Sequence, residues 1–285
     1  MGADNSKQKR PPNPPQRAFQ KIRDQFESFD ELQMALRNAG LESSNLILAI
    51  DYTKSNTWTG ERSFHGKCLH AIDPNGANMN PYQSVIAILG RTLESFDDDK
   101  LIPVFGFGDS TTGGNACFPF LPDGRVCQGF GQVLERYTQI TPGISLSGPT
   151  NFAPVIQEAI RICQAERSYH ILVIVADGQV TSERETIAAI VAASNLPLCA
   201  SYALCVRRSH IFSAAIIMVG VGDGPWGMME KFDDELPARR FDNFQFVEYN
   251  KTLRYNAHNP EVGFATAALM EIPEQYKTIC KLGLL

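Results

Sequence analysis

Side chains with hard oxygen atoms follow an aliphatic stretch early in the chain. In "LILAIDYTKS" the aliphatic run ends on Asp51, and hydroxyls follow at Thr53 and Ser55. If the backbone stays extended here, residues 51, 53 and 55 share one side, because side chains alternate along a strand. A carboxylate and two hydroxyls on one side are donors that suit a hard divalent cation.

Two more oxygen donors come later in the chain. Thr150 follows Gly148-Pro149, a turn-forming pair, and Asp177 ends the aliphatic run in "YHILVIVADG". A site with few carboxylates that is open to water suits Mg²⁺ or Mn²⁺ better than Zn²⁺, and Ca²⁺ is a weaker candidate. The candidate metal ligands are therefore Asp51, Thr53, Ser55, Thr150 and Asp177.

The elements predicted around these residues alternate between strands and helices. Strands are predicted at 45–51, 101–109, 116–120, 169–178, 214–224 and 244–249. Helices are predicted from residue 28, where Ser28 and Glu31 form a capping box, and at 80–96, 130–138, 152–164, 182–194, 260–270 and 273–281. This order predicts an α/β fold: a doubly wound, mostly parallel sheet with helices on both faces. In such folds ligands bind beyond the carboxyl ends of strands, where Asp51 and Asp177 stand.

The pattern D-x-T-x-S, followed by a later Thr and a later Asp, resembles the metal-ion-dependent adhesion site of von Willebrand factor A (vWA) domains. That family usually has Ser where this chain has Thr53, and the hydroxyl is kept. The resemblance implies a Rossmann-like fold, with direct coordination by the hydroxyls of Thr53, Ser55 and Thr150. Asp51 and Asp177 would hold the ion largely through waters. One position stays open, and a carboxylate of a binding partner typically fills it.

Longer segments are similar to one branch, the copine-type vWA domain. "NPYQSVIAILGRTL", "LIPVFGFGD", "SGPTNFAPVI" and "ALMEIPEQY" look like the plant RING-domain ubiquitin ligases that carry this domain, and the similarity starts near residue 25. The chain has no closely spaced Cys/His pairs of a RING finger. It also lacks the two N-terminal calcium-binding domains of copines. We therefore expect neither ligase activity nor calcium-dependent lipid binding from these residues alone.

Two segments differ from the predicted vWA domain, which spans residues 25–285. Residues 1–24 form a basic, proline-rich arm that we expect to be disordered, and its start fits the pattern for myristoylation of Gly2. Its basic side chains would add the second signal that a single acyl chain needs to hold a membrane. The segment 199–213 is extra relative to the family pattern. It is either a surface loop, a product of alternative splicing, or a functional insertion.

Two residues near the predicted site have two interpretations each. Asp109 follows "FGFG" at a strand end, where it either lines the rim of the metal cleft or caps a turn. Trp58 is either an exposed binding anchor beside the metal or a side chain packed on the domain. The five His show no paired spacing, so we expect no His-based active site.

Composition narrows the class of function. The net charge of −5 argues against general nucleic-acid binding, and no secretory signal or membrane-spanning run occurs. We expect a cytoplasmic protein, with plasma-membrane association through the N-terminus or a nuclear location as alternatives. The leading hypothesis is a divalent-metal-dependent module that binds an acidic residue of a protein partner, in a ubiquitination or membrane-associated signalling setting. The alternative is a truncated form or subunit of a RING-type E3 ubiquitin-protein ligase, and a metal-dependent phosphohydrolase is a third, weaker hypothesis.

Overall fold

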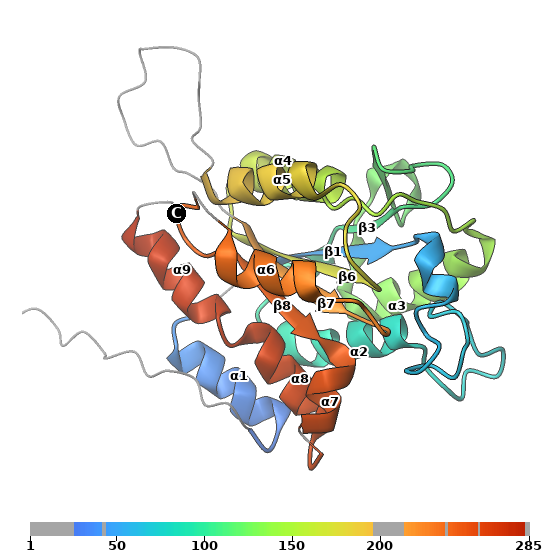
Figure 1. Cartoon of the computed structure of the whole chain (residues 1–285). Coiled ribbons are helices and arrows are strands. Elements are labelled where there is room, and N and C mark those ends of the chain that lie inside the picture. The colour runs from blue at the N-terminus through green and yellow to red at the C-terminus, as the bar shows by residue number, and fades with distance from the viewer. Residues whose placement is uncertain (1–25, 42–43, 196–213, 237–238, 256, 283–285) are drawn as a thin grey trace, which may run out of the picture.

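A six-stranded sheet forms the centre of the protein. The computed structural model describes residues 26–41, 44–195, 214–236, 239–255 and 257–282. The predicted arm, Gly2 and the segment 199–213 lie outside these residues. The strand order is β4-β3-β1-β6-β7-β8, and every neighbouring pair is parallel except β3 with β4. The predicted doubly wound, mostly parallel sheet is therefore confirmed (Figure 1).

The strands of this sheet are short and their interiors are buried. They are β1 (Asn45–Asp51), β3 (Val104–Phe107), β4 (Cys117–Pro119), β6 (His170–Ala176), β7 (Ala214–Gly220) and β8 (Phe244–Glu248). A separate pair joins β2 (Leu101–Ile102) to β5 (Cys127–Gln128). The single strand predicted at 101–109 is thus wrong in one respect: it is split at Pro103 into two strands of different sheets. Proline has no N–H to donate to a ladder, which accounts for the break.

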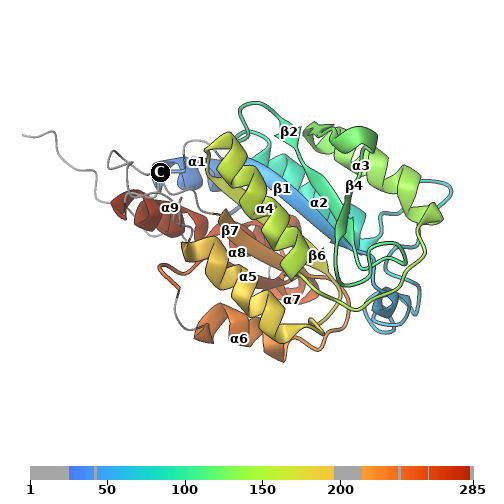
Figure 2. The same cartoon turned by 90° about the horizontal axis from the view of Figure 1, so that it is seen from above.

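Helices cover both faces of the sheet. One layer holds α1 (Phe29–Asn38), α2 (Pro81–Leu93), α3 (Gly129–Ile140), α7 (Tyr249–Tyr255), α8 (Pro260–Leu269) and α9 (Ile272–Lys281). The other holds α4 (Ala153–Glu166), α5 (Glu183–Asn195) and α6 (Gly227–Glu235). Figure 2 looks down on this second layer, with the strands beneath it. Each layer packs on its own face of the sheet, so each face has its own apolar core.

Local signals explain where several helices begin. The Ser28 hydroxyl accepts from the Glu31 N–H at 3.2 Å, as the predicted capping box requires, while the Glu31 carboxylate accepts from the N–H of Glu27. In α2, Asn80 and Gln83 form a complete capping box that the sequence analysis did not single out. Helices α6 and α7 were not predicted. Both are short and bury few side chains, so they leave little apolar periodicity to detect.

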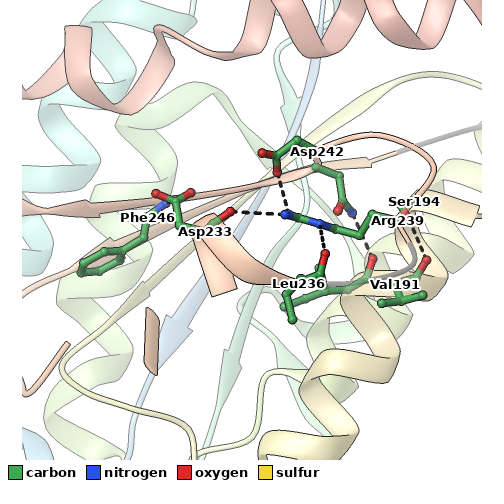
Figure 3. A network of polar contacts seen from close by, with 9 residues as sticks. Val191, Ser194, Asp233, Leu236, Arg239, Asp242 and Phe246 are labelled. Carbon is green, nitrogen blue, oxygen red and sulfur yellow. Dashed lines mark hydrogen bonds and ion pairs between the residues drawn. The ribbon is translucent and has the colours of Figure 1, made fainter. Parts of the chain in front are cut away.

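A buried arginine closes the C-terminal end of α6 (Figure 3). The Arg239 guanidinium donates to the carbonyl oxygens of Leu236 at 3.3 Å and Asp233 at 3.2 Å, and forms an ion pair with Asp242 at 2.6 Å. The carboxylate of Asp233 accepts from the N–H of Phe246 on β8 at 3.2 Å. This contact covers part of an edge strand, where an unpaired N–H could otherwise pair with another chain.

We predict that Asp233→Asn gains stability relative to the wild type as the pH rises from 5 to 8. Burial, followed by the negative charge of Glu271, raises the pKa of Asp233 from 3.8 to about 7. Between these two values the folded chain keeps a proton that the unfolded chain has released, so the folded state loses stability as the pH rises. Asparagine carries no charge and keeps an oxygen for the Phe246 N–H. Urea unfolding at both pH values measures the difference.

Asp234→Asn is the matched control, because Asp234 is the exposed neighbour of Asp233 on the same helix. Its stability relative to the wild type should change much less between the two pH values. If the difference between Asp233→Asn and the wild type were equal at pH 5 and pH 8, the titration assigned to Asp233 would be wrong.

Candidate metal centre

The sheet topology places the two predicted acidic ligands, Asp51 and Asp177, at one crevice. Strand β1 pairs with β3 on one side and with β6 on the other. The connections from this point therefore run in opposite directions, and the carboxyl ends of β1 and β6 form a topological switch point. Asp51 is the last residue of β1 and Asp177 directly follows β6. Both side chains are fully buried there.

The backbone after Asp51 stays extended as far as Thr53 and turns from Lys54. A 3₁₀ helix, η1 (Lys54–Thr57), begins directly after Thr53, so the expectation of an extended backbone through residues 51–55 is wrong. The Thr53 N–H donates to Asp51 Oδ1 at 2.8 Å, and Thr53 Oγ1 lies 2.9 Å from Ser55 Oγ. The helical turn therefore brings the two hydroxyls together, although for a different reason than strand alternation.

Asp177 joins the two hydroxyls from the other strand. Its Oδ1 accepts from Ser55 Oγ at 2.9 Å, and its Oδ2 accepts from Thr59 Oγ1 at 2.5 Å. Thr59 was not among the predicted site residues. Thr59 lies four residues after Ser55, and two residues at this spacing come together only when the chain turns as a helix. Thr59 Oγ1 also lies 3.0 Å from the Ser55 carbonyl oxygen. Thr59 was missed because the segment was expected to be extended.

The turn that carries Thr150 packs against the same loop. The Lys54 N–H donates to the Ser147 carbonyl at 2.6 Å, and Thr53 and Ser147 form a β-bridge. The Thr150 carbonyl accepts from the N–H of Thr181 at 2.8 Å, in the loop that follows Asp177. Among the described residues, no hydrogen bond joins the Thr150 hydroxyl to the other four candidates. Hydrogen bonds thus link four of the predicted ligands, Asp51, Thr53, Ser55 and Asp177. The turn that carries Thr150 lies next to them.

The two residues with open interpretations lie near this loop. The Asp109 carboxylate accepts from the hydroxyls and N–H groups of Thr111 and Thr112, so it caps a turn. Partial burial acts to raise its pKa, but the hydrogen bonds from Thr112 and Thr111 outweigh this and lower it. Trp58 is the C-cap of η1 and is 60% exposed, so it is available as a binding anchor, and that role stays a prediction.

The electrostatics of the two buried acids fit a divalent cation. Burial first, and then the charge of Asp177, raise the pKa of Asp51 well above its usual value of 3.8. Burial also raises the pKa of Asp177, although hydrogen bonds from Thr59 and Ser55 oppose the shift. Asp51 Oδ2 is buried and has no hydrogen-bond partner within the described part of the chain. A cation would compensate both charges and supply that missing partner.

The donor set is rich in hydroxyls and poor in charge. No cluster of three or more His, Cys, Asp or Glu side chains suited to a metal occurs among residues 26–41, 44–195, 214–236, 239–255 and 257–282. The candidate centre offers two carboxylates together with threonine and serine hydroxyls. Such oxygen donors suit a hard cation, and they do not form the nitrogen and sulfur set that zinc prefers.

A buried histidine lies directly behind the candidate centre. His70 Nε2 is 2.8 Å from the Asp51 carbonyl oxygen, and its Nδ1 is 2.8 Å from the Tyr137 hydroxyl. Burial lowers the pKa of His70 to about 3, so the ring is neutral. The ring stacks between Tyr52 and Tyr82, with centroid distances of 4.7 and 4.1 Å. His70 was not among the predicted site residues, and its spacing offers no signal, because its partners are 19 and 67 residues away.

Comparison with known proteins decides the family. The Copine family profile matches residues 68–285, which is more than half of the chain. The chain belongs to the copine family. E3 ubiquitin-protein ligase RGLG2 of Arabidopsis thaliana is 47% identical over 299 residues, covering 100% of this copine chain and 58% of that ligase. Copine family protein 1 of Caenorhabditis elegans is 50% identical over 260 residues, covering 90% of the chain and 22% of that protein. The resemblance noted in the sequence is therefore confirmed.

The copine chain spans little more than half the length of the Arabidopsis ligase that it matches. Among solved structures, manganese-loaded Plasmodium vivax TRAP protein covers 78% of the chain and 74% of its own length, at 12% identity and a TM-score of 0.43. None of the helices in the described part of the copine chain combines the length and apolar character needed to cross a bilayer.

Proposed function

We propose that this copine chain is a divalent-cation-dependent module that binds a protein partner. Mg²⁺ or Mn²⁺ would be held at the carboxyl ends of β1 and β6, and an acidic residue of the partner would occupy the open position of the ion. The proposed ligands, direct or through water, are Asp51, Thr53, Ser55, Thr150 and Asp177. Recognition would be a charge-assisted contact without chemistry on the partner.

The observation that carries this proposal is the buried acidic pair. Asp51 and Asp177 are fully buried at one crevice, and Asp51 Oδ2 has no partner among the described residues. Placing two carboxylates there without compensation costs free energy, since each buried charge raises the cost of the other. The hydroxyls of Thr53 and Ser55, 2.9 Å apart, stand beside the pair as further oxygen donors.

The proposal is tested by retention of partners on the immobilised full chain. Proteins from a host-cell extract that bind in Mg²⁺ should be released by EDTA and should not bind Asp51→Ala. Asp30→Ala, a change at an exposed acid on α1, is the control and should retain them. Peptides tiled from a retained protein then locate the contact, and binding should vanish when one Asp or Glu of the peptide becomes Asn or Gln. Retention that ignores EDTA, or peptides that bind equally without their acids, would refute the proposal.

The relatives favour a second candidate for the setting of this activity. The Arabidopsis protein that matches the whole chain is named as an E3 ubiquitin-protein ligase. On this alternative the copine chain supplies partner recognition for a RING-type ligase, while ubiquitin transfer depends on a RING that these 285 residues do not contain. For location, we propose a cytoplasmic module, with myristoylated Gly2 and the basic arm as the means of reaching a membrane surface.

A further inference from the structure

Three side chains converge on one backbone oxygen, the carbonyl of Asp51. His70 Nε2 lies 2.8 Å from it, and the Tyr82 hydroxyl and Asn56 Nδ2 each lie 3.3 Å from it. The three side chains come from different segments: η1, the loop before α2, and α2 itself. The Tyr82 hydroxyl donates its one hydrogen to Asn56 Oδ1 at 2.6 Å, so the donors to the carbonyl are His70 and Asn56. The shortest of the three contacts is that of His70. All of these side chains are fully or almost fully buried, so water does not compete for the carbonyl.

The His70 ring has one tautomer that satisfies its partners. A carbonyl oxygen only accepts, so Nε2 must carry the hydrogen that points at Asp51. Nδ1 then accepts from the Tyr137 hydroxyl, which lies 2.8 Å away. Asn80 Nδ2 lies 3.2 Å from the same hydroxyl and donates to it. The ring is thus fixed at both nitrogens, and the stacked rings of Tyr52 and Tyr82 fix its plane.

We propose that His70 is a positioning residue for the ion site, acting through the Asp51 carbonyl. Asp51 contributes both this carbonyl and the carboxylate that accepts from the Thr53 N–H at 2.8 Å. Holding the carbonyl therefore fixes the turn on which the carboxylate of Asp51 and the hydroxyl of Thr53 are placed. This inference rests on the proposed function, and it adds a residue with no contact to the ion itself.

Mn²⁺ affinity of the full chain, measured by electron paramagnetic resonance of the free ion, tests the proposal. His70→Phe keeps an aromatic ring in the stack and removes the donor, and we expect it to weaken Mn²⁺ binding by about 10-fold or more. His70→Gln places an amide N–H near the former Nε2 and should stay within about threefold of the wild type. Ile279→Ala creates a cavity under α9, far from the site in sequence, and should lower stability without changing the affinity.

A second readout does not depend on metal binding or on any variant. Long-range ¹H–¹⁵N spectra of the wild-type chain should show His70 as the Nε2–H tautomer. The Nδ1–H tautomer would overturn the proposal, and so would His70→Phe binding Mn²⁺ as tightly as His70→Gln. If the wild type bound no Mn²⁺, the proposed function and this inference would fall together. If it bound Mn²⁺ and all three variants matched it, only the role of His70 would fall.

Discussion

Mg²⁺ is expected to raise the melting temperature of the wild-type chain and to leave that of Asp51→Asn unchanged. A ligand that binds only the folded state adds about 2.7 kcal/mol at a concentration a hundred times its Kd. For a chain of this size each kcal/mol shifts the melting temperature by about 2–4 °C, so the wild type should gain about 5–10 °C. Differential scanning fluorimetry with and without Mg²⁺ measures the shift.

Without metal, we expect Asp51→Asn to be more stable than the wild type. Asp51→Asn has nearly the same shape and keeps an oxygen for the Thr53 N–H, but it removes a buried charge that faces Asp177. The variant should therefore melt above the wild type in EDTA. Asp109→Asn is the matched control, because its carboxylate is satisfied by Thr111 and Thr112 and caps a turn. It should lose stability and still respond to Mg²⁺. Equal responses to Mg²⁺ in wild type and Asp51→Asn would contradict the site.

Gly108→Ala is expected to be among the most destabilising single changes near the site. Gly108 has φ +79°, and a Cβ there would overlap the Cγ2 atom of Thr53 and lie 3.3 Å from its backbone nitrogen. The left-handed backbone costs an alanine about 1–2 kcal/mol, and forcing an extra methyl into packed surroundings adds about 1–3 kcal/mol. We expect a loss of about 2–5 kcal/mol by urea unfolding, together with loss of Mn²⁺ binding as Thr53 is displaced.

Gly76→Ala separates the two causes. Gly76 has φ +65°, close to that of Gly108, and an added Cβ would meet no atom within 4 Å. It should show only the cost of the backbone conformation, about 1–2 kcal/mol, with unchanged Mn²⁺ affinity. If both glycine variants lost the same stability and both bound Mn²⁺ normally, the contact between Gly108 and Thr53 would have no part in holding the site.

Patterns in the sequence predicted the sheet well because they are local. The aliphatic run before Asp51 and the run before Asp177 each form a buried parallel strand, and both acids stand at carboxyl ends as expected. The path of the chain after Asp51 was not predictable in the same way. The segment 53–55 is polar throughout and shows no hydrophobic periodicity. The 3₁₀ turn that begins at Lys54 is held by a backbone hydrogen bond to Ser147, which is distant in the sequence.

The missed residues depend on contacts between distant parts of the chain. Thr59 belongs to the site because it donates a hydrogen bond to Asp177, 118 positions later. His70 is held by the hydroxyl of Tyr137 on α3. No spacing rule links such positions, because the fold alone brings them together. Asp109 differs from these two residues, because its turn-capping contacts with Thr111 and Thr112 are local. The sequence left both of its interpretations open.

The hydrogen bond between Ser55 and Asp177 spans 122 positions and crosses from β1 to β6. The candidate centre therefore has no local precursor: a nascent chain that has emerged only as far as α4 contains Asp51, Thr53, Ser55 and Thr150 and still has no complete crevice. We therefore expect the site to form late, after long-range strand pairing, which is the slow part of building such a sheet. An ion bound there would mainly slow the unfolding of the assembled sheet and would have little influence on the rate of folding.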